Sequence, residues 1–458
     1  MTVVISNRGP HSFAQRPDGT FDVRPGSGGV ASALGPLLTS GAAGAGAAWI
    51  AAAITDDDRA AVRAGAATAP GIALTLLDFD PLVYRQYYDV ISNGTLWFLH
   101  HGLFDLPRRP RFDRHFREAW GAYRAVNQTF ADAAAATADE GDVVLVQDYQ
   151  LALVPGLLRA VRPDLRVVHF THTAFCGPNS IRVLPTDVAT ELCASMAAVP
   201  CGFHAARWAR AFVASAREML GQDATPSTFV APLGPDPAAL ASAAATPEVH
   251  AAGQELEEVV GDRLMLLRVD RVEPSKNIVR GFAAFDLLLE TEPTWRERVV
   301  FIARMNPSRE SLAEYLGYRN EVERAAARVN ERWSIDGWQP IVLDTRDDFA
   351  RTIAALRRYD VLLVNPIKDG LNLVAKEGPI LNQHDGVLCL SPDAGAWDEL
   401  GDAAFAAHPY DIDQCAGILH TALALAPEQR RVRSGHLRDL ASARTNRDWL
   451  ADQLAAAG

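Results

Sequence analysis

The chain has 458 residues, which is too long for one ordinary hydrophobic core and fits two domains with connecting segments. Hydrophobic residues make up 48% and charged residues 22% of the sequence, as is usual in globular proteins, and no apolar run approaches the ~20 residues that a membrane span needs. The net charge of −12 argues against nucleic acid or an anionic membrane as a partner, because both require a dominant basic face. A phosphorylated small molecule stays possible, since it needs only a few converging cations.

The cysteines and the first residues indicate a reducing compartment. The cysteines are odd in number, scattered and never in a CxxC pair, so we expect idle thiols and not a metal site (Cys176, Cys193, Cys201, Cys389 and Cys415). The opening residues MTVVISNRGP lack the basic and apolar regions of a secretory signal. We therefore expect a cytoplasmic protein.

The first half of the sequence predicts strands and helices in alternation. The aromatic and polar stretch 84–104 has no clear period and receives no assignment. We predict strands over 2–7, 47–54, 72–79, 142–148 and 165–172, and helices over 30–38, 111–138 and 151–161.

The composition changes over residues 222–260, which are rich in Pro and Ala and are predicted to be the crossing between domains. A second alternating series follows, and short strands separated by helices predict parallel sheets covered on both faces. Strands are predicted over 263–270, 298–304, 340–344, 360–365 and 387–391, with helices from Asn277, over 311–333, after 344 and over 441–457.

This pattern predicts an α/β protein with two doubly wound domains. We place one domain at 1–235, a second at 236–435, and a last helical segment at 436–458 that packs back towards the first domain. Ligands of such sheets bind beyond the carboxyl ends of the strands. Polar residues do follow the predicted strands, namely Arg8, Asp148, His172, Arg268, Asp270, Lys276 and Asp369.

Each of these residues has an ordinary alternative when taken alone. Arg8 could be a surface residue, Asp148 a helix cap and His172 a satisfied core histidine. The pair Gly28–Gly29 is by itself only a turn signal. Their occurrence at successive strand ends favours one shared ligand site.

The segment 361–378, VLLVNPIKDGLNLVAKEG, predicts a strand, a polar loop and a helix. The start of such a helix offers free backbone N–H groups to an anion. Arg268 and Lys276 would stabilise the growing charge of a departing diphosphate, and Glu377 can accept two hydrogen bonds from a ribose diol. Asp369 could bind sugar hydroxyls, so the sequence predicts a nucleotide-sugar site.

The segment DGLNLVAKE resembles the DGMNLVAKE segment of trehalose-6-phosphate synthases, which are retaining glycosyltransferases with two Rossmann-like (GT-B) domains. Further similar segments occur in the expected order along nearly the whole chain. They are SNRGP, GSGGVASAL, YYDVISNGTLW, VQDYQLALVP, HFTHTAF, GFHAARWARAF, RVDRVEPSKNIVRG, NPSRESLAEY and HPYD.

The resemblance implies a role for individual residues. Arg268 and Lys276 would be the principal electrostatic catalysts, Asp148 would orient the acceptor, and His172 would contact the transferred sugar. The donor would be bound by Gly28, Gly29, His172, Arg268, Lys276, Asp369, Gly370, Asn372, Leu373, Val374 and Glu377. The acceptor would be bound by Arg8, Trp49, Tyr88, Trp97, Asp148 and Arg309, although Tyr88 and Trp97 could equally be core aromatics.

The resemblance also implies the reaction. Glucose would pass from a nucleotide-glucose to glucose 6-phosphate to give α,α-trehalose 6-phosphate, by attack from the leaving-group side, without a cofactor or metal. The phosphate loop resembles an actinobacterial branch, which favours GDP-glucose over UDP-glucose. Donor and sugar-phosphate acceptor are the expected partners, and a homo-oligomer is plausible.

Three departures from the family pattern leave the substrates open. Leu371 replaces a methionine, QDYQL replaces HDYHL, and Ala174–Phe175 stand where Pro and Trp are commoner. One alternative is a pseudo-glycosyltransferase related to validoxylamine phosphate synthases, which joins a nucleotide-activated cyclitol to a phosphorylated acceptor. Another is a non-catalytic sensor of sugar phosphates, which would bind ligand without turnover.

Overall fold

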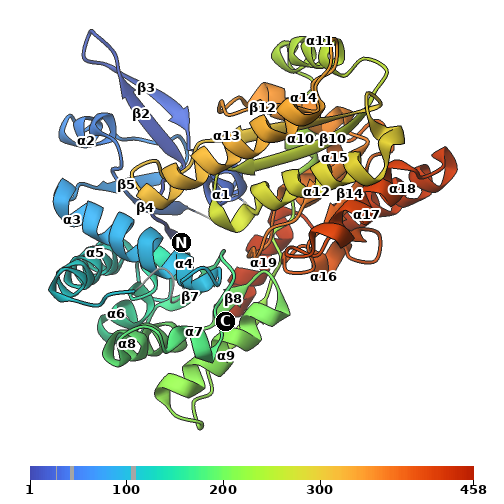
Figure 1. Ribbon diagram of the computed structural model, residues 1–458. Coiled ribbons are helices and arrows are strands. Elements are labelled where there is room, and N and C mark those ends of the chain that lie inside the picture. Colours follow the sequence, from blue (N-terminus) through green and yellow to red (C-terminus); the bar gives the residue numbers. More distant parts are fainter. Residues whose placement is uncertain (27, 42–45, 105–109) are drawn as a thin grey trace. The chain divides into compact units, whose positions relative to one another are not determined.

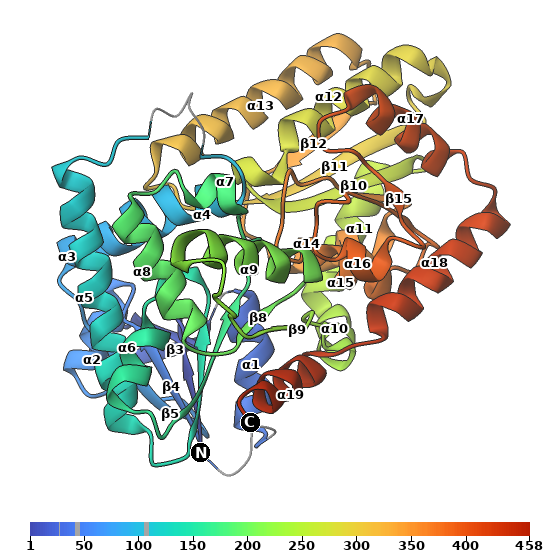
Figure 2. The ribbon, with the colours of Figure 1, turned by 90° about the horizontal axis from the view of Figure 1, so that it is seen from below.

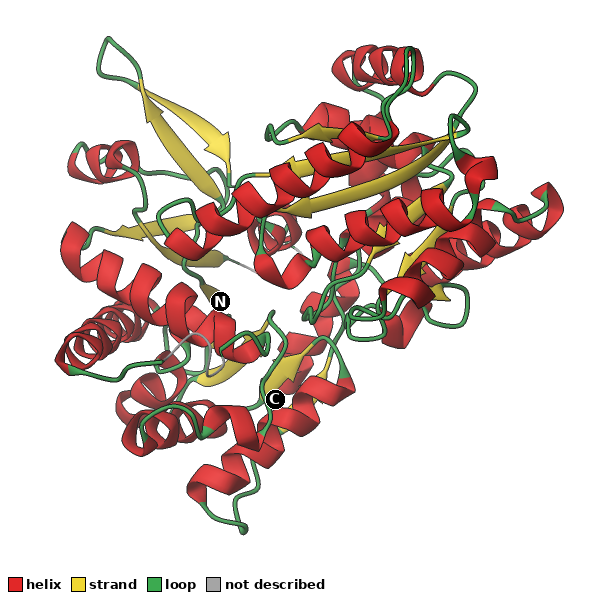
Figure 3. Cartoon of the chain, in the orientation of Figure 1, coloured by secondary structure: helices red, strands yellow, loops and turns green. Residues whose placement is uncertain are grey.

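The computed structural model describes residues 1–26, 28–41, 46–104 and 110–458. The chain divides into two compact units (Figure 1). The first unit contains 1–233 and 446–458, and the second contains 234–445. Both units alternate strands with helices (Figure 3), as the sequence pattern predicts.

The first unit is built on a parallel sheet whose strand order is β5-β4-β1-β6-β7-β8-β9 among the described residues. Strand β6 is the apolar run Val-Val-Leu-Val-Gln and is buried throughout, because helices cover both faces of a parallel sheet. An antiparallel hairpin of β2 (His11–Gln15) and β3 (Phe21–Pro25) is separate from it. The sheet contains β1 (Thr2–Ile5), β4 (Ala47–Ala52), β5 (Ala73–Leu77), β6 (Val143–Gln147), β7 (Arg166–Thr171), β8 (Cys201–Phe203) and β9 (Thr228–Val230).

Helices pack on both faces of this sheet. Figure 2 shows α5, α6 and α8 on one side, and α1 with the C-terminal helix α19 on the other. A π-helix, Gln86–Leu96, lies between α3 and α4 in the stretch that received no assignment. The helices are α1 (Gly29–Thr39), α2 (Asp56–Arg63), α3 (Pro81–Arg85), α4 (Trp97–His100), α5 (Arg114–Thr137), α6 (Val154–Val161), α7 (Pro178–Ile181), α8 (Thr186–Ala197), α9 (Ala206–Leu220) and α19 (Asn446–Ala456).

The second unit has a parallel sheet of order β12-β11-β10-β13-β14-β15. Its strands are β10 (Leu264–Arg271), β11 (Val299–Asn306), β12 (Ile341–Asp344), β13 (Val361–Val364), β14 (Val387–Leu390) and β15 (Phe405–Ala406). Its helices are α10 (Pro237–Ala244), α11 (Pro247–Val260), α12 (Ile278–Thr291), α13 (Ala313–Trp333), α14 (Phe349–Arg358), α15 (Val374–Leu381), α16 (Trp397–Leu400), α17 (Ile412–Leu423) and α18 (Pro427–Ser442).

The stretch 222–260, where the crossing is predicted, contains the boundary between the units at Leu233–Gly234, and it also contains β9, α10 and α11. Asp236 caps α10, Thr246 caps α11, and a proline follows each cap at the first helical position. Alanine is the strongest helix former, so its abundance here indicated helix and not linker.

The boundary expected between 435 and 436 also differs from the structure. It falls inside the continuous helix α18, and the chain re-enters the first unit only at Asn446. Asn446 donates a buried hydrogen bond of 3.1 Å to the carbonyl of Ala33 at this point. The short break Ala443–Thr445 between two helices gave no composition signal.

All five cysteines are buried free thiols. Among the described residues, no helix is long and apolar enough to cross a membrane.

Candidate active site

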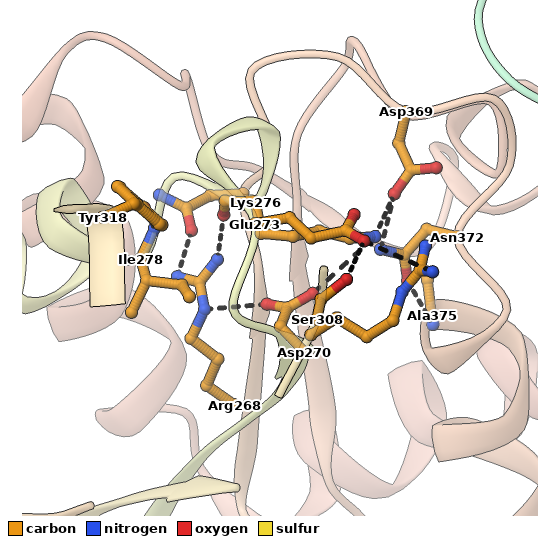
Figure 4. A network of polar contacts seen from close by, with 12 residues as sticks. Arg268, Asp270, Glu273, Lys276, Ile278, Ser308, Tyr318, Asp369, Asn372 and Ala375 are labelled. Atoms are coloured by element: carbon orange, nitrogen blue, oxygen red, sulfur yellow. Dashed lines mark hydrogen bonds and ion pairs between the residues drawn. The ribbon is translucent and has the colours of Figure 1, made fainter. Parts of the chain in front are cut away.

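The second unit gathers charged side chains at the carboxyl edge of its sheet. Arg271 ends β10, and a 3₁₀ turn, Pro274–Lys276, follows it. Strand β13 pairs in parallel with β10, so the loop that carries Asp369 leaves the sheet at the same edge. We call the following residues the charged cluster: Arg268, Asp270, Arg271, Glu273, Lys276, Arg309 and Asp369. Figure 4 labels all of them except Arg271 and Arg309.

Lys276 is a cation held in place by carboxylates. Its Nζ lies 2.6 Å from Asp369 Oδ2 and 3.9 Å from Asp270 Oδ1, and the side chain is 12% exposed. Burial alone would lower the pKa of Lys276, but Asp369, Asp270 and Glu273 outweigh it and raise the pKa. The lysine is therefore protonated and oriented before any ligand arrives.

The structure overturns the expected ligand contact of Arg268. Its side chain is fully buried, and its Nε and Nη1 donate to Asp270 Oδ2 at 2.8 Å and to Asn365 Oδ1 at 2.6 Å. Its Nη2 donates to the carbonyl of Lys276. Gly281 leaves the space for this guanidinium, since a Cβ there would lie 2.5 Å from Nη1. Arg268 thus fixes the backbone that carries Lys276 and is a positioning residue (Figure 4).

Arg271 is the arginine that the sequence reasoning missed. Its side chain is 55% exposed, and its Nη1 lies 3.3 Å from Glu273 Oε1. Burial would raise the pKa of Glu273, but Arg271, Arg309 and Lys276 lower it to about 2. The sequence did contain the signal: in RLDYSKG, the common form of this phosphate loop in trehalose-6-phosphate synthases, the arginine precedes the lysine by five positions, as Arg271 precedes Lys276.

Arg309, expected to bind the acceptor, belongs to this same cluster. It follows β11 with a φ of 46°, and its Nη1 lies 3.7 Å from Glu273 Oε1. It also donates to the hydroxyl of Tyr315, and its side chain is 12% exposed. Glu273 therefore holds two arginines, of which Arg271 is the more exposed.

Helix α15 brings the remaining donor-site candidates of this unit together. Leu373 caps it and Val374 is its first residue, so their amides belong to the first turn that lacks acceptors within the helix. Asn372, with a φ of 79°, donates from Nδ2 to Asp369 at 3.1 Å and accepts from the amide of Ala375. An anion at this helix start would meet backbone donors.

Glu377 faces a poorly hydrated environment without a compensating cation. Burial raises the pKa of its carboxyl to about 7. Its neighbour Lys376 is instead fully buried and paired with Glu399 at 2.9 Å. Gly370 is packed closely, because a Cβ on Gly395 would lie 1.9 Å from the Gly370 carbonyl oxygen. The pair Lys376–Glu399 anchors α15 and leaves Glu377 available to a ligand.

The first unit holds the other expected residues. Gly28 caps α1 with a φ of 125°, a conformation that favours glycine, and Gly29 opens the helix; both are exposed. Asp148 follows β6 with φ 74° and ψ 168°, a region that essentially only glycine adopts. Its Oδ1 accepts the backbone N–H of His172 at 3.0 Å. Such strain at a strand end is typical of a functional position.

Arg8 lies beside a group of tyrosines. It is exposed and follows Asn7, whose side chain hydrogen-bonds to the hydroxyls of Tyr84 and Tyr87. Tyr88 stacks on Tyr84 with ring centroids 5.6 Å apart and an interplanar angle of 11°. The structure thus brings Arg8 and Tyr88 to the same neighbourhood.

Trp49 and Trp97 are core residues, which corrects their expected acceptor contact. They are 0% and 2% exposed, and Trp49 Nε1 donates to Ser6 Oγ at 2.8 Å. Ala174 and Phe175 are also buried, so this departure from the family pattern changes the core and not an exposed pocket wall.

His172 is a neutral, doubly engaged histidine. Its Nε2 lies 2.9 Å from Gln147 Oε1, and its Nδ1 lies 3.1 Å from His204 Nε2. Burial, together with His204 and His169, keeps its pKa well below the usual range. His172 is therefore uncharged, which leaves the expected contact with the transferred sugar as its role and gives it no acidic proton to donate.

Taken together, the structure assembles the predicted residues in two groups. The second unit unites Lys276, Asp369, Asn372, Leu373, Val374 and Glu377 with Arg309, and adds Arg271. The first unit unites Asp148 with His172 and Arg8 with Tyr88.

Known proteins resemble this chain over its whole length. Residues 1–457 match the model of glycosyltransferase family 20. A trehalose-6-phosphate synthase of Mycolicibacterium vanbaalenii is 33% identical, with 95% of this chain and 91% of that protein covered. The Arabidopsis thaliana alpha,alpha-trehalose-phosphate synthase [UDP-forming] 1 is 32% identical over 98% of this chain, which spans only 48% of that longer protein.

A validamine 7-phosphate valienyltransferase of Streptomyces hygroscopicus subsp. jinggangensis is 31% identical, with 89% of this chain and 84% of that protein covered. Among solved structures, E. coli trehalose-6-phosphate synthase bound with UDP-2-fluoro glucose gives a TM-score of 0.84 at 26% identity, covering 100% of this chain and 98% of that one. The Burkholderia xenovorans alpha,alpha-trehalose-phosphate synthase (UDP-forming) in complex with glucose-6-phosphate gives 0.84 at 25%, covering 100% and 99%. We conclude that the chain is a glycosyltransferase of the GT-B fold and belongs to glycosyltransferase family 20.

Proposed function

We propose that this chain transfers glucose from a nucleotide-glucose to glucose 6-phosphate, with retention, to give α,α-trehalose 6-phosphate. The observation that carries this proposal is the charged cluster. A protonated Lys276 and an exposed Arg271 stand at one sheet edge, beside the start of α15. Fixed cations and backbone donors at such a place suit a diphosphate leaving group.

On this proposal the donor is held by the second unit and by the glycine turn at Gly28–Gly29. Lys276 and Arg271 bind the diphosphate, and the amides of Leu373 and Val374 add donors at the helix start. The carboxylate of Glu377 accepts hydrogen bonds from the two hydroxyls of the ribose diol. These bonds replace the hydrogen bonds to water that the carboxylate loses through burial. Asp369, with Gly370 and Asn372, meets the transferred glucose.

The acceptor is assigned to Arg8, Tyr88, Asp148 and Arg309. The guanidinium groups of Arg8 and Arg309 match the phosphate of glucose 6-phosphate. Asp148 is held in one orientation by its bond to the His172 amide, so it can align the attacking hydroxyl.

The reaction needs no protein nucleophile on this proposal. The acceptor hydroxyl attacks from the face that the diphosphate leaves, and a departing phosphate oxygen takes its proton. Arg271 and Lys276 stabilise the negative charge that develops on the diphosphate. Neutral His172 contacts the sugar region without supplying a proton.

For the nucleotide we favour GDP over UDP. The segment RVDRVEPSKNIVRG, which includes Arg271 and Lys276, resembles the actinobacterial branch that supports GDP-glucose. Two of the proteins above are named as UDP-forming and a third is bound with UDP-2-fluoro glucose, so UDP-glucose is the competing donor.

A pseudo-glycosyltransferase is the second candidate, because the chain is 31% identical to a validamine 7-phosphate valienyltransferase. Such an enzyme would use the same diphosphate cations and the same phosphate-binding arginines. It would differ in joining a nucleotide-activated cyclitol to a phosphorylated aminocyclitol.

The test is nucleotide release from GDP-glucose, UDP-glucose and ADP-glucose, each with glucose 6-phosphate, with the product identified by mass and NMR. We expect an α,α-1,1-linked disaccharide phosphate, formed fastest from GDP-glucose. Tight binding of GDP without turnover of any glucose donor would contradict the proposal. In that case a GDP-cyclitol donor is tested with an aminocyclitol phosphate. Turnover would support the pseudo-glycosyltransferase, and binding without turnover would support the sensor.

A further inference from the structure

A chain of hydrogen bonds runs through the first unit. It begins at Leu233, the last residue of the segment 1–233, and ends on the C-terminal helix α19. The Leu233 amide approaches His204 Nδ1 at 3.3 Å, and His204 Nε2 approaches His172 Nδ1 at 3.1 Å. His172 Nε2 lies 2.9 Å from Gln147 Oε1, and Gln147 Nε2 lies 2.9 Å from Gln453 Oε1 on α19. We call these five residues the neutral relay.

The chemistry of the groups fixes the direction of every bond in the relay. A backbone N–H can only donate, so His204 Nδ1 accepts and the proton of His204 is on Nε2. That proton is donated to His172 Nδ1, which places the proton of His172 on Nε2. His172 then donates to Gln147 Oε1, and the Gln147 amide donates to Gln453 Oε1. An acceptor at position 453 therefore keeps the Gln147 amide in the orientation that presents its oxygen to His172.

The relay is buried on both sides of His172, which is itself only half-buried. His204, Gln147 and Gln453 are 4%, 1% and 0% exposed. Trp449, one helical turn before Gln453 on α19, stands edge-on to His172 with ring centroids 5.5 Å apart. Helix α19 thus supplies both a wall and a hydrogen-bond acceptor to the His172 region.

We propose that Gln453 is a positioning residue, which through Gln147 holds His172 in the Nε2–H tautomer and in one ring orientation. The inference rests on the proposed function only in assigning the sugar region to His172. Gln147, the first residue of the departure QDYQL, accepts from His172 with its oxygen and donates to Gln453 with its nitrogen.

The experiment compares Gln453→Met, which keeps the side-chain volume but removes the acceptor, with Gln453→Glu, which keeps an acceptor oxygen. Ala451→Met, at an exposed position of the same helix, is the matched control. The full chain is labelled with ¹⁵N-histidine, and His172 is assigned from the signal lost in His172→Gln. Melting temperature and steady-state kinetics are measured on the same samples.

We expect the Nε2–H pattern for His172 in the unmodified chain, in Gln453→Glu and in Ala451→Met. Gln453→Met should show a mixture of tautomers and a kcat lower by about 10- to 100-fold, with the KM for acceptor little changed, because misalignment acts on the reacting geometry. An unchanged His172 spectrum in Gln453→Met, or a loss of melting temperature alone, would overturn the inference. If no substrate is turned over, the proposed function fails, while the spectra still decide the role of Gln453.

Discussion

The charged cluster of the second unit consists of paired ionised side chains, whereas the neutral relay of the first unit consists of uncharged hydrogen-bonded groups. The cluster balances cations against carboxylates, with Lys276 between Asp369 and Asp270 and Glu273 between Arg271 and Arg309. The relay holds two histidines without any charge, because burial keeps the pKa of His172 low. On the proposed function, the charged cluster stabilises the charge that develops during the reaction, and the neutral relay orients His172 without adding charge.

Replacing Arg268 should have the largest effect, and comparing it with Arg271 tests the structural role of the buried arginine against the ligand role of the exposed one. In Arg268→Met the buried Asp270 loses its closest cation and keeps only Lys276 at 3.9 Å, and removing one partner of a buried ion pair costs about 3–5 kcal/mol. We expect the free energy of unfolding to fall by that amount in denaturant titration. In Arg271→Ala, at an exposed site, stability should fall less, because Arg309 still faces Glu273, while nucleoside diphosphate binding weakens. The reverse pattern would return the ligand role to Arg268.

Lys276→Ala tests whether the cluster acts on the leaving group. Removing one fixed charge from a preorganised site lowers kcat by about 10²–10³-fold. We expect this loss in initial-rate measurements with saturating donor. The matched control is Arg431→Ala, at an exposed position of α18, which should retain full activity. Equal losses in both variants would show that net charge and not position matters.

The pH dependence of nucleotide binding sharpens the role of Glu377. Its pKa is raised to about 7 by burial, so the carboxyl is mostly protonated at pH 6 and ionised at pH 8. Only the ionised form accepts two hydrogen bonds from a diol, so affinity should rise by about 10-fold between these pH values. Calorimetric titration with GDP measures this, and dividing by the affinity of Glu377→Gln removes the titration of the phosphates. A ratio independent of pH would place the ribose elsewhere.

The backbone of Asp148 offers the smallest of these effects. Asp148→Ala and Asp148→Gly both lose the bond to the His172 amide, but only glycine relaxes φ 74° and ψ 168°. We expect the glycine variant to be more stable than the alanine variant by about 1–2 kcal/mol, by thermal unfolding, with both nearly inactive. Equal stability of the two would mean that no strain is stored there.

The sequence correctly predicted the features that are determined by short segments of the chain. The apolar strands, the order of helices and the polar residues at strand ends all follow from short segments, and Lys276 and Asp369 do meet. It did not separate Arg268 from Arg271, because a strand covered on both faces does not reveal by alternation which side chain is enclosed. The burial of Trp49 and Trp97 is likewise set by distant segments.

Long-range partners were also beyond local reasoning. Gln147 and Gln453 are 306 positions apart, and no sequence pattern near either residue indicates that the two are hydrogen-bonded. The domain boundary at 435–436 failed for a related reason, since the crossing at Ala443–Thr445 is too short to change the composition. The spacing of Arg271 and Lys276, in contrast, was visible in the sequence and would have identified Arg271 as the phosphate-loop arginine.

The π-helix at Gln86–Leu96 has a consequence for insertions and deletions. Its wide turns bring Ser92 Oγ to the carbonyl of Tyr87 and Thr95 Oγ1 to that of Val90, each at 2.9 Å and five residues apart. Such a turn contains one residue more than an α-helix needs. Deleting one residue here would restore ordinary helical bonds and rotate the preceding and following side chains, including Tyr88, by about 100° relative to each other. A single codon deletion could therefore leave a folded helix while realigning the tyrosines beside Arg8.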